Sequence, residues 1–205
     1  MKKIILLCLG LGLATLSQAA GDRSYVLSTA GPVDFALVDA VRNYLEEQTG
    51  TRLRLGEPIS MEEGETLEEV GHAAVRKLGE KDHSIIVLAR PMDNQPQGIC
   101  LPHERFAVLN IAKLEVGADE KQLERRVDRE GLRVMAMLLN MSQCPFPLCV
   151  LVSYKNVEDL DSMSANYCPP CQDRFHRLAV AAGLNLIAAD SVAAAPAGPA
   201  PAAAE

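Results

Sequence analysis

The sequence predicts a single α/β domain with a mixed β-sheet, and three of its features indicate this fold class. Apolar runs typical of strands alternate with amphipathic helical segments over residues 24–89. An order of strand, helix, strand, helix and strand is typical of crossover units, which pack helices against a sheet. A long helical pattern follows over about residues 120–141, and a small cysteine-rich part with one more helix ends the domain.

The first half of the domain is predicted to supply three strands and two helices. Residues 24–30 form an apolar run before a turn, and residues 51–57 alternate polar and apolar side chains as a half-buried strand does. A helix is predicted between these strands, ending at Gly50, because four apolar residues recur at helical spacing: Phe35, Val38, Val41 and Leu45. Residues 66–80 predict a second helix that starts with a capping box, and residues 83–89 predict a buried strand.

The second half is predicted to add two strands, the long helix and a final helix. Residues 98–101 and 105–111 are the candidate strands, joined by a turn at Pro102. The long helix has these apolar positions: Leu123, Val127, Val134, Leu138 and Met141. Residues 153–166 are predicted to form a polar loop, and the final helix follows that loop.

The two ends of the chain differ in composition from the domain between them. Residues 1–20 combine two early lysines, an apolar run and small residues, which is the pattern of a secretory signal peptide. Residues 187–205 are rich in alanine and proline without apolar periodicity, which predicts a disordered tail. We therefore expect an exported protein, periplasmic or secreted, with a domain over residues 21–186 and no membrane span after signal removal.

The net charge and the aromatic content exclude several classes of partner. The chain of 205 residues has a formal net charge of −7, and it contains no tryptophan. An acidic domain without a basic stripe argues against nucleic acids and anionic membranes as partners. The sequence also has no glycine-rich phosphate loop and no Gly-x-Ser-x-Gly motif.

Four cysteines after the long helix are the strongest functional signal in the sequence. Four residues separate Cys144 from Cys149, eighteen follow, and two then separate Cys168 from Cys171. Four thiolates in two close pairs suit a tetrahedral zinc ion. In an oxidising compartment the same residues can form two disulfides. Spacing and compartment alone leave zinc and disulfides both open.

This cysteine spacing resembles that of archaemetzincins, a family of zinc metallopeptidases. Their signature runs His-Glu-x-x-His-x-x-Gly-x-x-His-Cys-x4-Cys-x-Met and continues, about seventeen residues later, to Cys-x-x-Cys. All four cysteines fit this pattern, and Arg129-Glu130 matches the basic and acidic pair that often precedes the first histidine. The order of strands and helices is also similar over roughly the whole domain. The resemblance implies a metzincin-like domain with a long active-site-type helix, and one structural zinc ion bound by the cysteines.

The catalytic positions of that signature are all substituted in this sequence. Its residues His, Glu, His, Gly, His and Met fall, in that order, on Arg133, Val134, Met137, Asn140, Gln143 and Leu151. A guanidinium cannot deprotonate to bind zinc, and valine offers no base for a metal-bound water. Asn140 alone is expected to keep a structural role, because asparagine tolerates the left-handed backbone that a glycine adopts at a helix end.

The sequence thus predicts a non-catalytic relative of zinc peptidases that serves as a binding or interaction module. Its cleft is expected to accept an extended peptide or protein segment by strand addition, which needs only main-chain groups. The alternative is a zinc-dependent hydrolase with an unorthodox site, although none of the four histidines pairs with another at helical spacing. Cys100 is expected to be a small apolar filler in a strand, with an intermolecular disulfide as its alternative.

Overall fold

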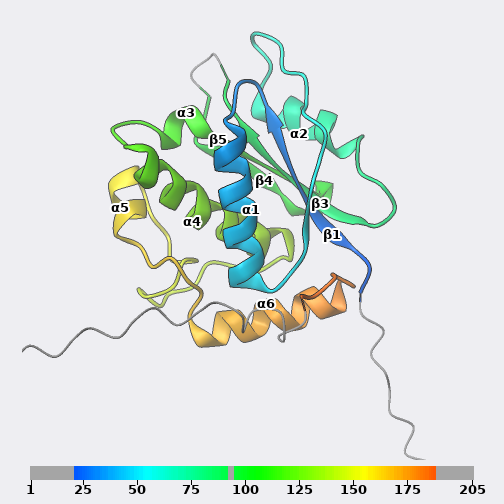
Figure 1. Ribbon diagram of the computed structural model, residues 1–205. Coiled ribbons are helices and arrows are strands. Elements are labelled where there is room, and N and C mark those ends of the chain that lie inside the picture. The colour runs from blue at the N-terminus through cyan, green and yellow to red at the C-terminus, as the bar shows by residue number, and fades with distance from the viewer. Residues whose placement is uncertain (1–20, 92–94, 188–205) are drawn as a thin grey trace, which may run out of the picture.

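The computed structural model describes residues 21–91 and 95–187 (Figure 1). The predicted signal peptide and residues 188–205 of the predicted tail lie outside the described residues. The described part of the chain contains, in order, β1 (Ser24–Ala30), α1 (Phe35–Thr49), β2 (Leu53–Leu55), α2 (Leu67–Val75), β3 (Asp82–Ala89), β4 (Gly98–Leu101), the 3-10 helix η1 (Pro102–Glu104), β5 (Phe106–Asn110), α3 (Ile111–Leu114), α4 (Glu120–Leu138), α5 (Val157–Ser162) and α6 (Pro169–Ala181).

The five strands form one mixed sheet in the order β2-β1-β3-β5-β4. The first four strands in this order pair in parallel, whereas β4 runs antiparallel to β5. β4 therefore lies at one edge of the sheet, and its outer side pairs with no other strand among the described residues. This architecture confirms the predicted α/β class and mixed sheet.

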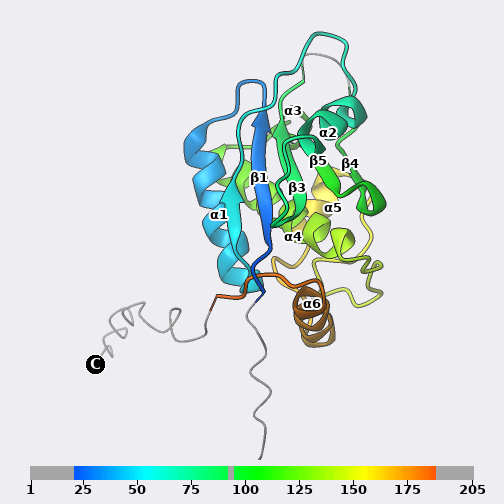
Figure 2. The ribbon, with the colours of Figure 1, turned by 90° about the vertical axis from the view of Figure 1, so that its right-hand side faces the viewer.

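Helices cover both faces of the sheet. The side chains of α1 and α4 share one apolar core with β1, β3 and β5, while α2 packs on the opposite face (Figure 2). Gly71 permits the close approach of α2, because a Cβ there would lie only 2.1 Å from an atom of the Phe106 ring. No helix in the described ranges is long and apolar enough to cross a membrane.

Several local sequence signals act as predicted. Gly50 ends α1 with a left-handed backbone at φ 64°, and Thr66 and Glu69 form both hydrogen bonds of a capping box at the start of α2. The five apolar positions predicted for the long helix are all buried. Asn140 has φ 58°, so it does adopt the left-handed conformation expected where the related signature has glycine.

Three details of the expected elements are wrong. Phe35 is 68 % exposed, because it is the first residue of α1 and lies beyond the part of that helix face which the sheet and α4 cover. The long helix ends at Leu138 rather than near Met141. The predicted polar loop contains α5, which Asn156 caps by accepting a hydrogen bond from the Asp159 N–H, and which buries Leu160 completely.

A row of arginines on α4 holds the irregular segment that follows the helix. Arg126 pairs with Asp161 at 2.7 Å, and Arg129 Nε donates to the Met163 carbonyl at 3.2 Å. Arg133 donates to two further carbonyl groups in the same segment. The segment is therefore positioned by buried side chains of α4 as well as by its own apolar residues.

Candidate metal centre and adjoining cleft

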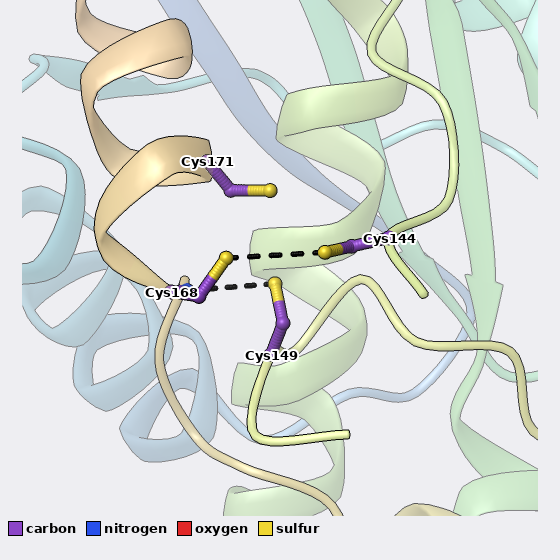
Figure 3. Close-up of side chains that lie close together, drawn as sticks. All are labelled: Cys144, Cys149, Cys168 and Cys171. Carbon is purple, nitrogen blue, oxygen red and sulfur yellow. Dashed lines mark hydrogen bonds between the residues drawn. The ribbon is translucent and has the colours of Figure 1, made fainter. Parts of the chain in front are cut away.

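The four predicted cysteines converge on one point between the loop that follows α4 and the start of α6. Cys144 and Cys149 come from the loop after the helix, and Cys168 is the N-cap residue of α6 with Cys171 in the first turn of that helix (Figure 3). Their four sulfur atoms all lie within 4.8 Å of one another. Cys149 and Cys168 are buried, and the other two are partly buried.

The geometry of the quartet fits a tetrahedral metal site. Zn–S bonds of about 2.3 Å place neighbouring sulfurs of such a site about 3.8 Å apart, and the Cys144 and Cys168 sulfurs lie at 3.8 Å. All four thiols are free, whereas a disulfide would need a sulfur–sulfur distance of about 2.05 Å. Among the described residues this is the only group of three or more cysteine, histidine or acidic side chains arranged to hold a metal ion.

Main-chain N–H groups support negative charge on the quartet. The Cys168 N–H donates to Cys149 Sγ at 3.4 Å, and the Phe146 N–H donates to Cys144 Sγ at 3.5 Å. Burial raises the pKa of the Cys149 and Cys171 thiols. Burial also opposes ionisation of Cys168, but hydrogen bonds from the Cys171 backbone and from neighbouring thiols lower its pKa. A metal ion at this site would displace the remaining thiol protons.

A separate cavity of about 310 Å³ opens between the edge strand β4 and α4. Its walls come from β4 and the residue before it, from β5, from the C-terminal half of α4, and from the segment between the two cysteine pairs. The lining residues are Gln97, Gly98, Ile99, Cys100, Leu109, Glu130, Arg133, Val134, Met137 and Tyr154. Three of the six substituted motif positions, Arg133, Val134 and Met137, thus face this cavity, which we call the β4–α4 cleft.

Arg133 links three parts of the protein at the base of the cleft. Its Nη1 donates to the Val150 carbonyl at 2.6 Å and to the Val152 carbonyl at 2.7 Å. Its Nε lies 3.1 Å from Glu130 Oε1, and its guanidinium carbon lies 4.8 Å from the centroid of the Tyr154 ring. The side chain is only 9 % exposed. A fixed cation therefore connects α4 to the turn after Cys149 at the position where the related signature has its first histidine.

The other substituted positions offer nothing to a catalytic metal. Val134 is buried and Met137 is 36 % exposed in the cleft wall. Gln143 lies outside the cleft lining, where its Oε1 accepts a hydrogen bond from Ser153 at 2.6 Å. Leu151 is 3 % exposed, and its main-chain carbonyl accepts from the Cys144 N–H at 3.0 Å. The residues present do not fit a second, catalytic zinc ion.

Two polar residues of the cleft, Tyr154 and Glu130, are not predicted as site residues by the sequence. Tyr154 accepts a hydrogen bond from Gln97 and hydrogen-bonds the carboxyl group of Glu130. Burial raises the pKa of Glu130, while Arg133 and the bond from Tyr154 act in the opposite direction. The spacing of Glu130 and Arg133, three apart on a helix, was a usable signal for their ion pair. Nothing in the sequence around Tyr154 indicates its role.

The histidines lie outside the cleft, whereas Cys100 lies in its wall. His72 pairs with Glu104, and His83 is partly buried beside Ser84 with a pKa that burial lowers to about 4. None of the four histidines lines the cleft. Cys100 does line it, and burial raises the pKa of its thiol to about 12, which agrees with the role of a mainly apolar filler.

Comparison with known proteins supports the fold. No family model and no curated protein matches the chain. Among solved structures, archaemetzincin from Methanopyrus kandleri superimposes with a TM-score of 0.64 at 16 % identity, covering 77 % of this chain and 96 % of that one. This chain has an archaemetzincin-like fold. A zinc-dependent peptidase from Methanocorpusculum labreanum gives a TM-score of 0.63 at 16 % identity, with coverages of 74 % and 100 %.

A third archaemetzincin-like match is a malonate complex of archaemetzincin from Archaeoglobus fulgidus. Its TM-score is 0.54 at 16 % identity, and the match covers 73 % of this chain and 99 % of that one. These matches confirm the archaemetzincin-like α/β fold that the sequence predicts, and the four neighbouring cysteines are consistent with its small cysteine-rich C-terminal part. At this identity they establish the fold and leave the activity to be argued from the residues of the chain.

Proposed function

We propose that this chain is an exported, non-catalytic binding protein that retains an archaemetzincin-like scaffold. The observation behind this proposal is the buried guanidinium of Arg133 at the first motif position, with both of its Nη1 contacts made to main-chain carbonyls. A dication placed beside this guanidinium would meet a fixed positive charge. Val134 supplies no carboxylate in place of the motif glutamate, so a metal-bound water would have no base there.

The proposed metal is a single structural zinc ion at Cys144, Cys149, Cys168 and Cys171. Four thiolates close the coordination shell, which leaves no position for a reactive water. A zinc ion there would join the loop after α4 to the start of α6, because each of these parts supplies one cysteine pair. Disulfides remain the alternative that export itself would favour.

The proposed partner is an extended peptide or protein segment that binds in the β4–α4 cleft. Strand addition needs an unpaired sheet edge, which β4 provides, and an adjacent surface for alternate side chains. The cleft provides such a surface with Leu109, Val134 and Met137. Because these contacts use main-chain and apolar groups, binding does not depend on a catalytic metal.

Two measurements on the purified mature protein test this proposal. Elemental analysis is expected to find one zinc ion per chain, and assays on unstructured peptides are expected to show no turnover with or without added zinc. Two zinc ions per chain, with turnover that a chelator abolishes and zinc restores, would instead establish the alternative zinc-dependent hydrolase. Circular dichroism after chelation is the control, because it separates loss of a catalytic metal from loss of the fold.

Export is tested independently of activity. The full chain, expressed with its first 20 residues in a Gram-negative host, is expected in the periplasm or medium with those residues removed. Mass spectrometry of the recovered protein measures this cleavage. An intact N-terminus on protein recovered from the cytoplasm would contradict the proposed localisation.

A further inference from the structure

The pairing of β4 with β5 determines which main-chain groups face the free edge. The Asn110 N–H donates to the Gln97 carbonyl at 2.9 Å, and the strands continue in antiparallel register with Ile99 opposite Val108. In an antiparallel pair, every second residue exchanges main-chain hydrogen bonds with the partner strand, and the main-chain groups of the residues between them point away from that strand. Gly98 and Cys100 therefore direct their N–H and C=O groups away from β5, and both residues line the cleft.

Arg133 has one nitrogen to spare beside this edge. Nη1 is used by the carbonyls of Val150 and Val152, and Nε faces Glu130. Nη2 has no acceptor among the residues that the structure describes, although the side chain lines the cleft. Since Nη2 is not among the buried nitrogen and oxygen atoms without a partner, solvent or a ligand can reach it. The cleft thus contains a rigidly held hydrogen-bond donor.

The charge of the donor indicates what kind of acceptor suits it. Glu130 lies 3.1 Å from Arg133 Nε, and Glu130 Oε1 is buried without a directed hydrogen bond from any described residue. The pair is close to neutral as a unit, and a carboxylate ligand would add an uncompensated charge next to Glu130. A neutral carbonyl oxygen accepts from Nη2 without that cost. The local charges therefore favour an amide carbonyl over a free carboxylate.

We propose that Arg133 Nη2 donates a hydrogen bond to a main-chain carbonyl of an extended peptide added to β4. This inference rests on the proposed function, namely that the cleft binds peptides. Alternate residues of an added strand bond to Gly98 and Cys100, and the residues between them direct their carbonyls away from β4. The guanidinium belongs to α4, which forms the wall of the cleft opposite β4. Since it never loses its proton, it holds the carbonyl without generating a nucleophile.

The test uses a capped, fluorescein-labelled peptide of alternating valine and threonine with a lysine at each end. Its dissociation constant is measured by fluorescence anisotropy with the zinc-loaded mature protein. Each carbonyl of the peptide is then replaced in turn by a thiocarbonyl, which is a weaker hydrogen-bond acceptor of similar shape. One thiocarbonyl position is expected to weaken binding about tenfold, because a bond from a charged donor is lost there.

Matched variants assign this effect to Arg133. In the double variant Glu130→Gln, Arg133→Met, which removes both charges together, the parent peptide is expected to bind about tenfold more weakly and the sensitive thiocarbonyl to have no further effect. Arg177→Met removes an exposed arginine of α6 and is expected to change neither value. Because the thiocarbonyl series is measured on the unaltered protein, it decides the question even if the double variant fails to fold.

Three outcomes would overturn the inference, and they differ in what else they affect. If the unaltered protein does not bind the peptide, the proposed peptide-binding function fails and the inference with it. If it binds with no sensitive thiocarbonyl and no dependence on Arg133, the inference fails while the proposed function stands. If an uncapped peptide binds more tightly through its terminal carboxylate and needs Arg133, the acceptor is a carboxylate and the proposed carbonyl contact is wrong.

Discussion

The cysteine quartet and the β4–α4 cleft differ in how well they match the archaemetzincin signature that the sequence resembles. The quartet has all four of its sulfur donors in mutual range. The cleft has an arginine, a valine and a methionine at positions where the related signature has metal ligands and a base. In the cleft, hydrogen bonds from Arg133 to two main-chain carbonyls link α4 to the turn after Cys149. Such hydrogen bonds link segments but do not activate a water molecule as a metal ion does.

The largest expected effect is at the quartet. Cys168→Ala removes one ligand, so we expect loss of the zinc ion and a lower free energy of unfolding, since a structural zinc can contribute on the order of 10 kcal/mol to folding. Elemental analysis and urea denaturation measure the two effects. Cys100→Ala is the matched control and is expected to keep the zinc ion.

Counting free thiols distinguishes a zinc site from two disulfides at the quartet. Denatured, metal-stripped protein without its first 20 residues is expected to show five free thiols, those of Cys100 and the quartet. A single free thiol would mean that the quartet is oxidised to two disulfides and that the zinc assignment is wrong. In that case the disulfides would cross-link the segments covalently, and the quartet and Arg133 would still both link segments of the chain.

The next largest effect is expected at Arg133. Arg133→Met leaves Glu130 buried without its partner, and breaking a buried pair in this way costs about 3 kcal/mol or more. The double variant Glu130→Gln, Arg133→Met is expected to recover part of the loss, because no unpaired charge remains. Urea denaturation of the three proteins measures this. Equal stability of the unaltered protein and Arg133→Met would contradict a linking role for the guanidinium.

A smaller, pH-dependent effect is expected at Asp128, which lies two residues before Glu130 on α4. Burial, together with the nearby Glu124, raises its pKa to about 8 although Arg129 acts in the opposite direction, and its Oδ1 has no partner among the described residues. The unfolded carboxyl titrates near 3.9. Between about pH 4 and pH 8 the folded state therefore holds a proton that the unfolded chain releases, and stability falls as the pH rises.

Asp128→Asn removes this titration. The variant is expected to be more stable than the unaltered protein by about 2 kcal/mol at pH 5.5 and to approach it near pH 4. Thermal unfolding across this pH range gives the comparison. Parallel stability curves for the two proteins would show that Asp128 does not titrate in the way its surroundings indicate.

The smallest effect is expected at Asn140. Its φ of 58° suits glycine better than any residue with a Cβ, so Asn140→Gly should leave stability unchanged or slightly higher. Asn140→Ala should cost about 1 kcal/mol, because alanine lacks the local hydrogen bonding that lets asparagine adopt this conformation. Thermal unfolding of both variants is the measurement. If alanine is tolerated as well as glycine, the turn imposes no backbone requirement.

The strands and the main helices could be predicted from the sequence because each depends on local pattern, and the quartet could be predicted because its spacing resembles that of a known family. Gly50 and the Thr66–Glu69 capping box set helix ends through neighbouring residues alone. Phe35 was expected on the apolar face of α1 but is exposed. Helical periodicity gives the direction in which a side chain points and not how far the elements that cover this face extend. The contacts of Arg133 were out of reach, since its acceptors are carbonyls 17 and 19 residues away that any residue would provide.

The arginine row of α4 has a consequence for the evolution of this protein's sequence. Arg126, Arg129 and Arg133 all donate to main-chain carbonyls, and Arg129 and Arg133 reach those of the irregular segment after the helix. A carbonyl is present whichever amino acid occupies the position. Sequence drift in that segment can therefore replace its exposed side chains while the path of its backbone stays where α4 holds it.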